Sequence, residues 1–107
     1  MIAVIFEAKA KPEQQQRYFQ LSAELKPLLS DIDGFISVER FTSLADPEKF
    51  LSLSWWRDAE SIRQWKTNMQ HQSAQTEGYQ SIFSFYQIRV AEVIKDDSSN
   101  TKGKHNV

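Results

Sequence analysis

Hydrophobic and polar residues alternate with a period of two in four segments of the chain, a pattern that predicts β-strands. In the first, residues 2–9, the face with Ile2, Val4, Phe6 and Ala8 opposes one with Ala3, Ile5 and Glu7. In the second, residues 35–41, the opposing sets are Phe35, Ser37, Glu39, Phe41 and Ile36, Val38, Arg40. The third is residues 50–56 and the fourth, the longest, residues 82–94. We therefore expect four strands.

Two further segments have helical spacing. Pro12 suits a first helical position, and apolar residues recur at intervals of three and four up to about residue 31, with a kink expected at Pro27. Asp58 is a good N-cap for a second helix in which Ile62, Trp65 and Met69 share a face. These segments alternate with the strands as strand, helix, strand, strand, helix, strand.

Turn residues separate the elements. Gly34 follows the first helix, Asp46 and Pro47 lie between the second and third strands, and Gly78 precedes the fourth. The second and third strands are therefore expected to form a hairpin. Residues 96–107 are polar without an apolar period, so we expect one domain over residues 1–95 and a flexible tail that includes His105.

This order of elements is that of an α+β fold of ferredoxin-like type, β-α-β-β-α-β, with a four-stranded antiparallel sheet. Both helices lie on one face of such a sheet. On several strands, however, apolar residues occupy both faces, as in the adjacent pairs Trp55 and Trp56 and Phe85 and Tyr86. An exposed apolar face of this size favours a homodimer whose two sheets enclose a barrel, and the alternative is a monomer with scattered surface aromatics.

Composition narrows the partners. The chain has 107 residues, 13 Lys and Arg against 14 Asp and Glu, and a net charge of −1, which gives no overall field for nucleic acid or an anionic membrane. No window approaches the roughly 20 apolar residues of a membrane span. The absence of cysteine excludes disulfides, thiolate metal sites and a cysteine nucleophile. These features predict a soluble protein and fit a cytoplasmic location.

Four stretches carry a resemblance to a known family: MIAVIFEAKAKPE, IDGFISVERF, FLSLSWWRDAESIRQWKTNMQHQSAQ and FYQIRVAEVI. In order and spacing they resemble the antibiotic-biosynthesis monooxygenase (ABM) domain family, a branch of the dimeric α/β-barrel superfamily, over nearly all of residues 1–95. The resemblance implies a ferredoxin-like dimer with a pocket between sheet and helices. Members include enzymes that oxidise polycyclic aromatic substrates with dioxygen and no cofactor, enzymes that degrade heme, and proteins without a known activity.

His71 and Trp65 are the candidate catalytic residues. Histidine titrates near neutral pH, so His71 is suited to act as a general base or hydrogen-bond donor. Trp65 would form a pocket wall and donate its indole N–H to a substrate oxygen. The alternative is that Trp65 belongs to the core and that His71 caps or packs at a helix end. Six residues turn a helix by about 600°, which leaves the two positions roughly 120° apart, so they share a site only if the helix breaks near Asn68.

Five other residues are candidates for substrate binding. Arg40 and Arg89 could orient an anionic or phenolate substrate, although strand arginines are commonly solvated or paired across strands. Tyr18 and Tyr86 could line the cavity or belong to the core. Trp55 is the fifth, and since adjacent strand residues point to opposite faces, only one of Trp55 and Trp56 is expected to face a ligand. Glu7 and Glu39 could act as bases if buried.

The resemblance also implies a test for heme. Heme-degrading members pair the helix tryptophan with an asparagine on the first strand and a heme-ligating histidine about ten residues after the tryptophan. Here the first strand has no asparagine and Gln75 holds the later position, so that set is incomplete. No stable metal site is expected, because no second histidine lies near His71. We therefore predict a cofactor-independent monooxygenase that uses dioxygen on a small aromatic or quinol-like substrate. The alternatives are a heme-binding, heme-degrading enzyme and a noncatalytic dimeric module that binds a small ligand.

Overall fold

The computed structural model describes the backbone of residues 1–75 and 82–99, and the side chains of residues 1–67 and 82–99. The elements in order are β1 (Ile2–Ala10), a 3-10 turn η1 (Pro12–Gln14), α1 (Gln15–Ser30), β2 (Phe35–Thr42), β3 (Lys49–Trp56), α2 (Ala59–Gln75) and β4 (Phe83–Glu92). In the part of the chain that the structure describes, no helix is long and apolar enough to cross a membrane. Gly78 and His105 lie outside the described residues.

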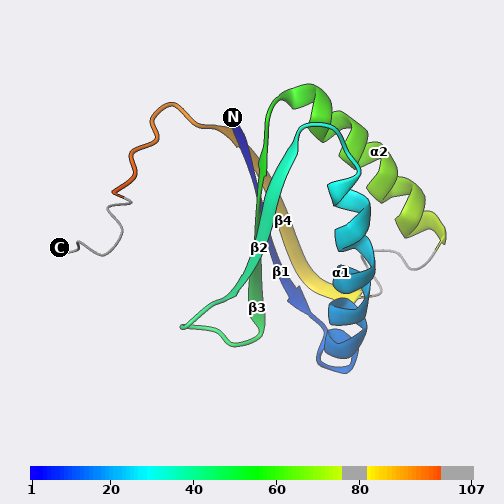
Figure 1. The fold of residues 1–107 in the computed structure, drawn as a ribbon. Coiled ribbons are helices and arrows are strands. Elements are labelled where there is room, and N and C mark those ends of the chain that lie inside the picture. The colour runs from blue at the N-terminus through cyan, green and yellow to red at the C-terminus, as the bar shows by residue number, and fades with distance from the viewer. Residues whose placement is uncertain (76–81, 100–107) are drawn as a thin grey trace.

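The four strands form one antiparallel sheet in the order β2-β3-β1-β4. Both helices lie on the same side of this sheet (Figure 1). The side that they cover is called the helix-facing side below, and the other is called the open face. This arrangement confirms the predicted α+β, ferredoxin-like fold and the hairpin of β2 and β3.

The strand register places residues of neighbouring strands in rows that share a face. Val4 lies opposite Ser54 on β3 and Val90 on β4, and Phe6 lies opposite Ser52 and Ile88. These rows face the helices. The alternate rows, such as the one that joins Ile5 to Leu53 and Arg89, lie on the open face.

Two irregularities in this register correct the simple alternation. The pairing of β2 shifts between Phe35 and Ser37, and the pairing of β1 with β4 shifts between Lys9 and Ala10. As a result Phe35 packs edge-on against Trp56, with ring centroids 5.1 Å apart, instead of sharing a face with Phe41. Phe83 likewise enters the core, whereas Phe85 is exposed. Each irregularity therefore turns one aromatic ring from the expected face into the core.

The helix-facing core consists of two clusters of buried side chains. The first gathers near the start of α1 and comprises Ala8, Ala10, Tyr18, Phe50, Ile82 and Phe83. The second gathers near the end of α1 and the start of α2 and comprises Val4, Leu29, Ile32, Trp56 and Ile62, with Trp65 packed against it. On β3, Phe50 belongs to the first cluster and Trp56 to the second, with Ser52 and Ser54 between them.

The helix ends follow the predicted signals. Pro12 opens the 3-10 turn, and α1 begins three residues later and continues through Pro27. Gly34 has a φ of 95°, a left-handed conformation that glycine adopts without strain. Asp58 caps α2 as predicted, because its carboxylate accepts a hydrogen bond from the backbone N–H of Ser61 at 3.0 Å.

Candidate functional site

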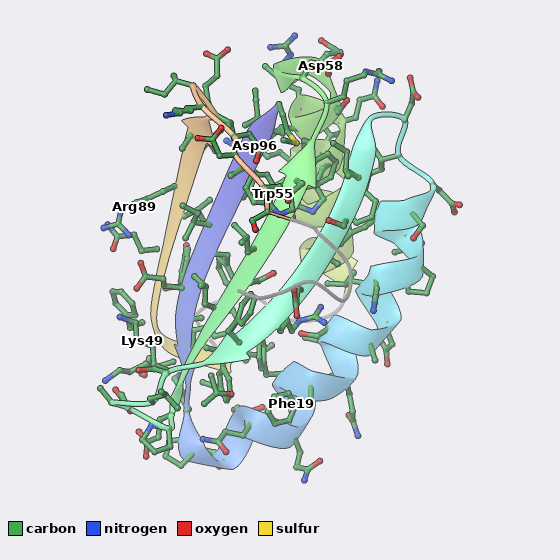
Figure 2. The ribbon with its side chains drawn as sticks, turned by 60° about the vertical axis from the view of Figure 1, so that its left-hand side comes forward. Phe19, Lys49, Trp55, Asp58, Arg89 and Asp96 are labelled. Atoms are coloured by element: carbon green, nitrogen blue, oxygen red, sulfur yellow. The ribbon has the colours of Figure 1, made fainter. Side chains whose placement is uncertain are left out.

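The sheet divides six of the seven candidate site residues between its two sides. Tyr18 and Trp65 lie on the helix side, and the register places Arg40 and Tyr86 on strand faces that point the same way. Trp55 and Arg89 lie on the open face, which Figure 2 brings forward. In one copy of the chain these residues therefore do not form a single site. In particular, Arg40 and Arg89 cannot orient the same small molecule from one side of the sheet.

Trp65 lies against the fully buried Trp56, with ring centroids 5.6 Å apart. Trp56 donates its indole N–H to the hydroxyl oxygen of Ser54 at 2.8 Å. Trp65 is only partly buried, and among the described residues its own indole N–H meets no acceptor. Of the two adjacent rings, Trp65 is thus the one whose indole N–H is not engaged by a described residue.

His71 lies on α2, which runs without interruption from Ala59 to Gln75. The break near Asn68 that would bring His71 and Trp65 to one face of the helix is therefore absent. In a continuous helix the two positions stay roughly 120° apart. The side chain of His71 lies outside the described residues, so its role stays a prediction separate from that of Trp65.

The two tyrosine candidates differ in environment. Tyr18 is 5% exposed and packs against Phe50 and Phe83, each with a ring-centroid distance of 5.4 Å. It is a member of the first core cluster. Tyr86 is 43% exposed, and its ring lies 6.2 Å from that of Phe6 and 6.0 Å from that of Phe83. Tyr86 therefore offers ring surface to a ligand on the helix-facing side, and Tyr18 supports that surface from behind through Phe83.

Apolar surface is exposed along the helix-facing side of β4. Ile88 and Val90, in the rows of Phe6 and Val4, are exposed as Tyr86 is. On β3 the same two rows hold Ser52 and Ser54, whose small side chains lie between the two core clusters. Ser52 and Ser54 are called the serine strip below. The middle of the helix-facing side thus combines small polar groups on β3 with exposed apolar groups on β4.

Arg40 extends from β2 toward α1, where its guanidinium donates a hydrogen bond to the backbone carbonyl of Ser22 at 3.3 Å. Among the described residues it has no acidic partner. Arg40 thus joins the edge of the sheet to α1 and retains its positive charge on the helix-facing side.

The open face carries a compact group of ion pairs. Glu7 accepts hydrogen bonds from Lys49 at 2.8 Å and from Arg89 at 2.7 Å. The ammonium of Lys49 holds the pKa of Glu7 below its ordinary value, with partial burial opposing and Arg89 reinforcing the effect. A carboxylate with a lowered pKa and two cationic partners is a weak base, so Glu7 is poorly suited to act as a general base. Arg89 is held by this carboxylate, and Glu39 is exposed on β2.

A polar clasp joins the turn before β2 to the start of α2. The guanidinium of Arg57 binds Asp33 at 3.0 Å and Asp58 at 3.1 Å, and its backbone N–H donates to the carbonyl of Gly34 at 2.8 Å. Hydrogen bonds from the backbone and hydroxyl of Ser61, with a further contribution from Arg57, lower the pKa of Asp58 to about 2. The clasp fixes the first turn of α2 and hence the position of Trp65 above Trp56.

Sequence reasoning missed the residues that orient this site, namely Ser54, Arg57 and Ser61. Ser61 follows Asp58 at the spacing of a capping interaction and could have been found from that signal. Ser54 has no comparable local signal, since a serine on a strand is most often solvated. Among the described residues, no three His, Asp or Glu side chains gather in a way that could hold a metal ion.

Comparison with known proteins identifies the family. Residues 1–77 match the family described as antibiotic biosynthesis monooxygenase. The chain is 41% identical over 100 residues to a protein of Pyricularia oryzae named jasmonate monooxygenase ABM. The match covers 94% of this chain and 46% of that protein, so the chain spans about half the length of this relative.

Solved structures share the fold at low sequence identity. Rv0793 from Mycobacterium tuberculosis matches with a TM-score of 0.78 and 12% identity, over 91% of this chain and 98% of that one. A MhuD variant with two manganese protoporphyrin IX molecules bound per active site matches with a TM-score of 0.73 and 11% identity, over 92% and 100% of the two chains. These likenesses concern the fold alone. Together with the family match over residues 1–77, the comparisons establish that the chain belongs to the antibiotic biosynthesis monooxygenase family.

Proposed function

We propose that the protein is a monooxygenase that acts on a small, largely apolar molecule and requires no tightly bound cofactor. The observation that carries the proposal is the 41% identity, over nearly the whole chain, to a protein named as a monooxygenase. The helix-facing side of the sheet supports it, because Tyr86, Ile88 and Val90 expose apolar surface there.

The proposed substrate position is the middle of the helix-facing side, between the serine strip, β4 and α2. Between the two core clusters, the helix-facing side of β3 carries only the small side chains of the serine strip. Trp65 lies beside this region on α2. An apolar wall with a few polar groups is the usual composition of a small-molecule site. Tyr86 and Trp65 would contact the substrate, and Arg40 would contribute positive charge from the edge of the sheet.

The electron balance of the reaction selects the substrate class. When the CH₂ group of an anthrone reacts with dioxygen to give a carbonyl and water, the substrate itself supplies all four electrons. Such a reaction needs only deprotonation of the substrate and a site that keeps water away from the reactive carbanion. We therefore propose an electron-rich aromatic or quinol-like substrate, with His71 as the candidate base and Trp65 as a donor to the substrate oxygen.

Jasmonate is the second substrate to test, because the relative from Pyricularia oryzae is named for it. Its cyclopentanone could ionise to an enolate, which fits the same oxyanion chemistry. Conversion of a C–H to a C–OH group, however, consumes two electrons beyond those of that bond. A jasmonate reaction therefore requires an added reductant, whereas an anthrone reaction does not.

Oxygen uptake tests the proposal directly. Purified protein, freed of heme and treated with a chelator, would be mixed with an anthrone, a hydroquinone or jasmonate, the last with and without a reductant. We expect uptake and a product that carries ¹⁸O from ¹⁸O₂ with at least one of them. Trp65→Phe and His71→Ala are each expected to slow the reaction about 100-fold, within the range of general acid-base contributions.

The controls separate the enzyme from its site. Unchanged uptake in both variants would refute the assignment of Trp65 and His71 while leaving the monooxygenase activity intact. Saturable binding of these compounds without any uptake would instead support the noncatalytic alternative, a dimeric module that binds a small ligand. Lack of both binding and uptake would contradict the proposed substrate class.

Heme is the alternative cofactor, favoured by the fold shared with the porphyrin-bound MhuD variant. The residues fit it poorly, since β1 contains no asparagine and α2 ends at Gln75, where the family resemblance expects a histidine. Heme titration decides this alternative. A defined Soret shift that His71→Ala abolishes would support heme binding, and an unchanged spectrum would exclude it.

We further propose a homodimer in which two open faces pack together. This face carries Ile5, Leu51, Leu53, Trp55 and the exposed Phe41, and no helix of the described chain covers it. Light scattering is expected to give twice the chain mass, with Trp55→Glu shifting the protein to monomer. A monomeric wild-type protein would contradict the dimer. The cytoplasmic location stays a prediction from the sequence, for cell fractionation to check.

A further inference from the structure

Two serines, Ser54 and Ser61, are the buried polar residues of the described chain. Both donors of Ser61 are hydrogen-bonded, since its backbone N–H and its hydroxyl donate to Asp58 at 3.0 and 2.8 Å. The hydroxyl of Ser54, a residue that is 6% exposed, has only one of its hydrogen bonds satisfied. Its oxygen accepts the indole N–H of Trp56 at 2.8 Å, but among the described residues its own proton meets no acceptor. Because buried polar groups are nearly always hydrogen-bonded, this remaining donor calls for an explanation.

Trp56 fixes the orientation of this donor. Its indole is fully buried and packs against the rings of Phe35 and Trp65, which restrict its orientation. Its N–H points along β3 into the lone pair of Ser54, two residues earlier on the same face. The hydroxyl proton must therefore point away from the indole. A hydroxyl that already accepts a hydrogen bond is also a stronger donor.

The position of Ser54 matches that of the proposed substrate. On the helix-facing side it lies between Val4 of β1 and Val38 of β2, in the serine strip that separates the two core clusters. Its direct partners across the strands, Val4 and Val38, are apolar. A ligand oxygen seated on the strip would find the Ser54 hydroxyl as a preoriented donor between two valines.

We propose that Ser54 binds the substrate by donating its hydroxyl hydrogen bond to a phenolate or enolate oxygen, and that Trp56 is the positioning residue that aims it. The inference rests on the proposed function and deepens it by naming the oxyanion as the recognised group. A hydrogen bond to the charged form favours that form and lowers the pKa of the bound phenol or enol. The anion is the electron-rich species that can reduce dioxygen, so Ser54 would raise its share of the bound substrate.

The test uses 4-nitrophenol, whose anion absorbs visible light, and its methyl ether 4-nitroanisole as a probe that cannot ionise. Wild-type protein is expected to bind the nitrophenolate and to lower the pKa of the bound probe. Ser54→Ala is expected to weaken nitrophenolate binding at least tenfold, about 1.4 kcal/mol, and to raise the bound pKa by about one unit. Affinity for 4-nitroanisole should change less than twofold.

A second pair of variants separates a loss of binding from a loss of stability. Ser54→Ala also leaves the buried Trp56 N–H without an acceptor, which lowers stability by itself. Ser54→Thr and Ser54→Val have nearly the same shape, but only threonine keeps the hydroxyl. We expect the threonine variant to retain the lowered pKa of the bound probe and the valine variant to lose it. Trp56→Phe should weaken nitrophenolate binding by a smaller factor, and Ser37→Ala, on the open face, should leave it unchanged.

The outcomes distinguish this inference from the proposed function. Equal nitrophenolate affinities and equal bound pKa values in the threonine and valine variants would overturn the inference, because Ser54 would then serve only to satisfy Trp56. Such a result would leave oxygen uptake by the wild type, and hence the proposed function, untouched. Failure of the wild type to bind nitrophenolate would also overturn the inference, whereas uptake with an anthrone or jasmonate would still be decided by its own assay.

Discussion

The two faces of the sheet differ in the charge of the polar group at their centre. On the helix-facing side the buried polar group of the sheet is neutral, and Ser54 is held by one hydrogen bond from Trp56. On the open face the central group is the charged Glu7, held by Lys49 and Arg89. Burial of an isolated charge is far more costly than burial of a hydroxyl, which explains why the polar side chain that is buried on the described strands is a hydroxyl, whereas the charged Arg40 of the helix-facing side is exposed. This contrast fits the two proposals above, small-molecule chemistry on the helix-facing side and assembly through the open face.

Two adjacent tryptophans of β3, Trp55 and Trp56, lie on opposite faces of the sheet. Trp56 is fully buried under the helices, and Trp55 lies partly exposed on the open face. The two residues have the same side chain and are neighbours on one strand, so they differ mainly in the face of the sheet on which they lie. Substitutions at these two positions therefore measure the two faces separately.

The largest effect is expected from Trp56→Ala. Removal of a fully buried indole should lower the free energy of unfolding by about 3 to 5 kcal/mol. Trp55→Ala, its matched control, should cost about 1 kcal/mol in the isolated chain and act instead on dimer formation. Urea unfolding at several protein concentrations separates the two. Equal losses that do not depend on concentration would refute the division between a core face and an assembly face.

The next largest effect concerns the clasp that holds the helix layer to the sheet. A Cβ on Gly34 would lie 1.8 Å from the Ser61 hydroxyl oxygen, and the φ of 95° is unfavourable for alanine. Gly34→Ala should therefore destabilise the fold by about 2 to 4 kcal/mol. Combining it with Ser61→Ala removes the clashing oxygen and should recover part of the loss in thermal unfolding. Full additivity of the two substitutions would show that this contact does not limit the packing of α2.

The smallest effect is expected on the open face, from Glu7→Gln. Since Lys49 and Arg89 keep the pKa of folded Glu7 below its ordinary value of 4.5, the ionised carboxylate stabilises the fold above that pH. This contribution is lost as the pH falls through the lower pKa of the folded state. The stability gap between wild type and variant should thus narrow below pH 4.5, and 1 M NaCl should reduce it at pH 7. A stability difference between wild type and variant that increases in acid would contradict the lowered pKa of folded Glu7.

Much of the fold could be predicted because its signals are local. The alternation in residues 2–9 gave β1, the Asp58 cap gave the start of α2, and Gly34 gave a turn that requires left-handed backbone. The boundaries of the elements differed slightly from those predicted. The fourth strand, for example, was predicted over residues 82–94 and spans Phe83–Glu92.

The candidate site was harder to predict because its membership depends on register. Arg40 and Arg89 each look like a strand arginine in the sequence, yet pairing places one on the helix-facing side and the other on the open face. Phe35 and Phe83 changed face at irregularities that no periodic pattern reveals. The pairing of Ser54 with Trp56 joins two residues of one strand, but Trp56 is buried by residues such as Leu29 of α1 and Ile62 of α2.

The amino-acid sequence by itself determined the order of strands and helices, the caps and turns, and a family resemblance carried by short motifs. These features depend on neighbours within a few positions, which the sequence displays directly. Only the tertiary structure decided which face of the sheet each side chain occupies, that α2 continues through Asn68, and that the hydroxyl proton of the buried Ser54 meets no acceptor among the described residues. The physical reason is that burial and strand register arise from contacts between segments far apart in the chain, and a shift of one residue in register exchanges the two faces.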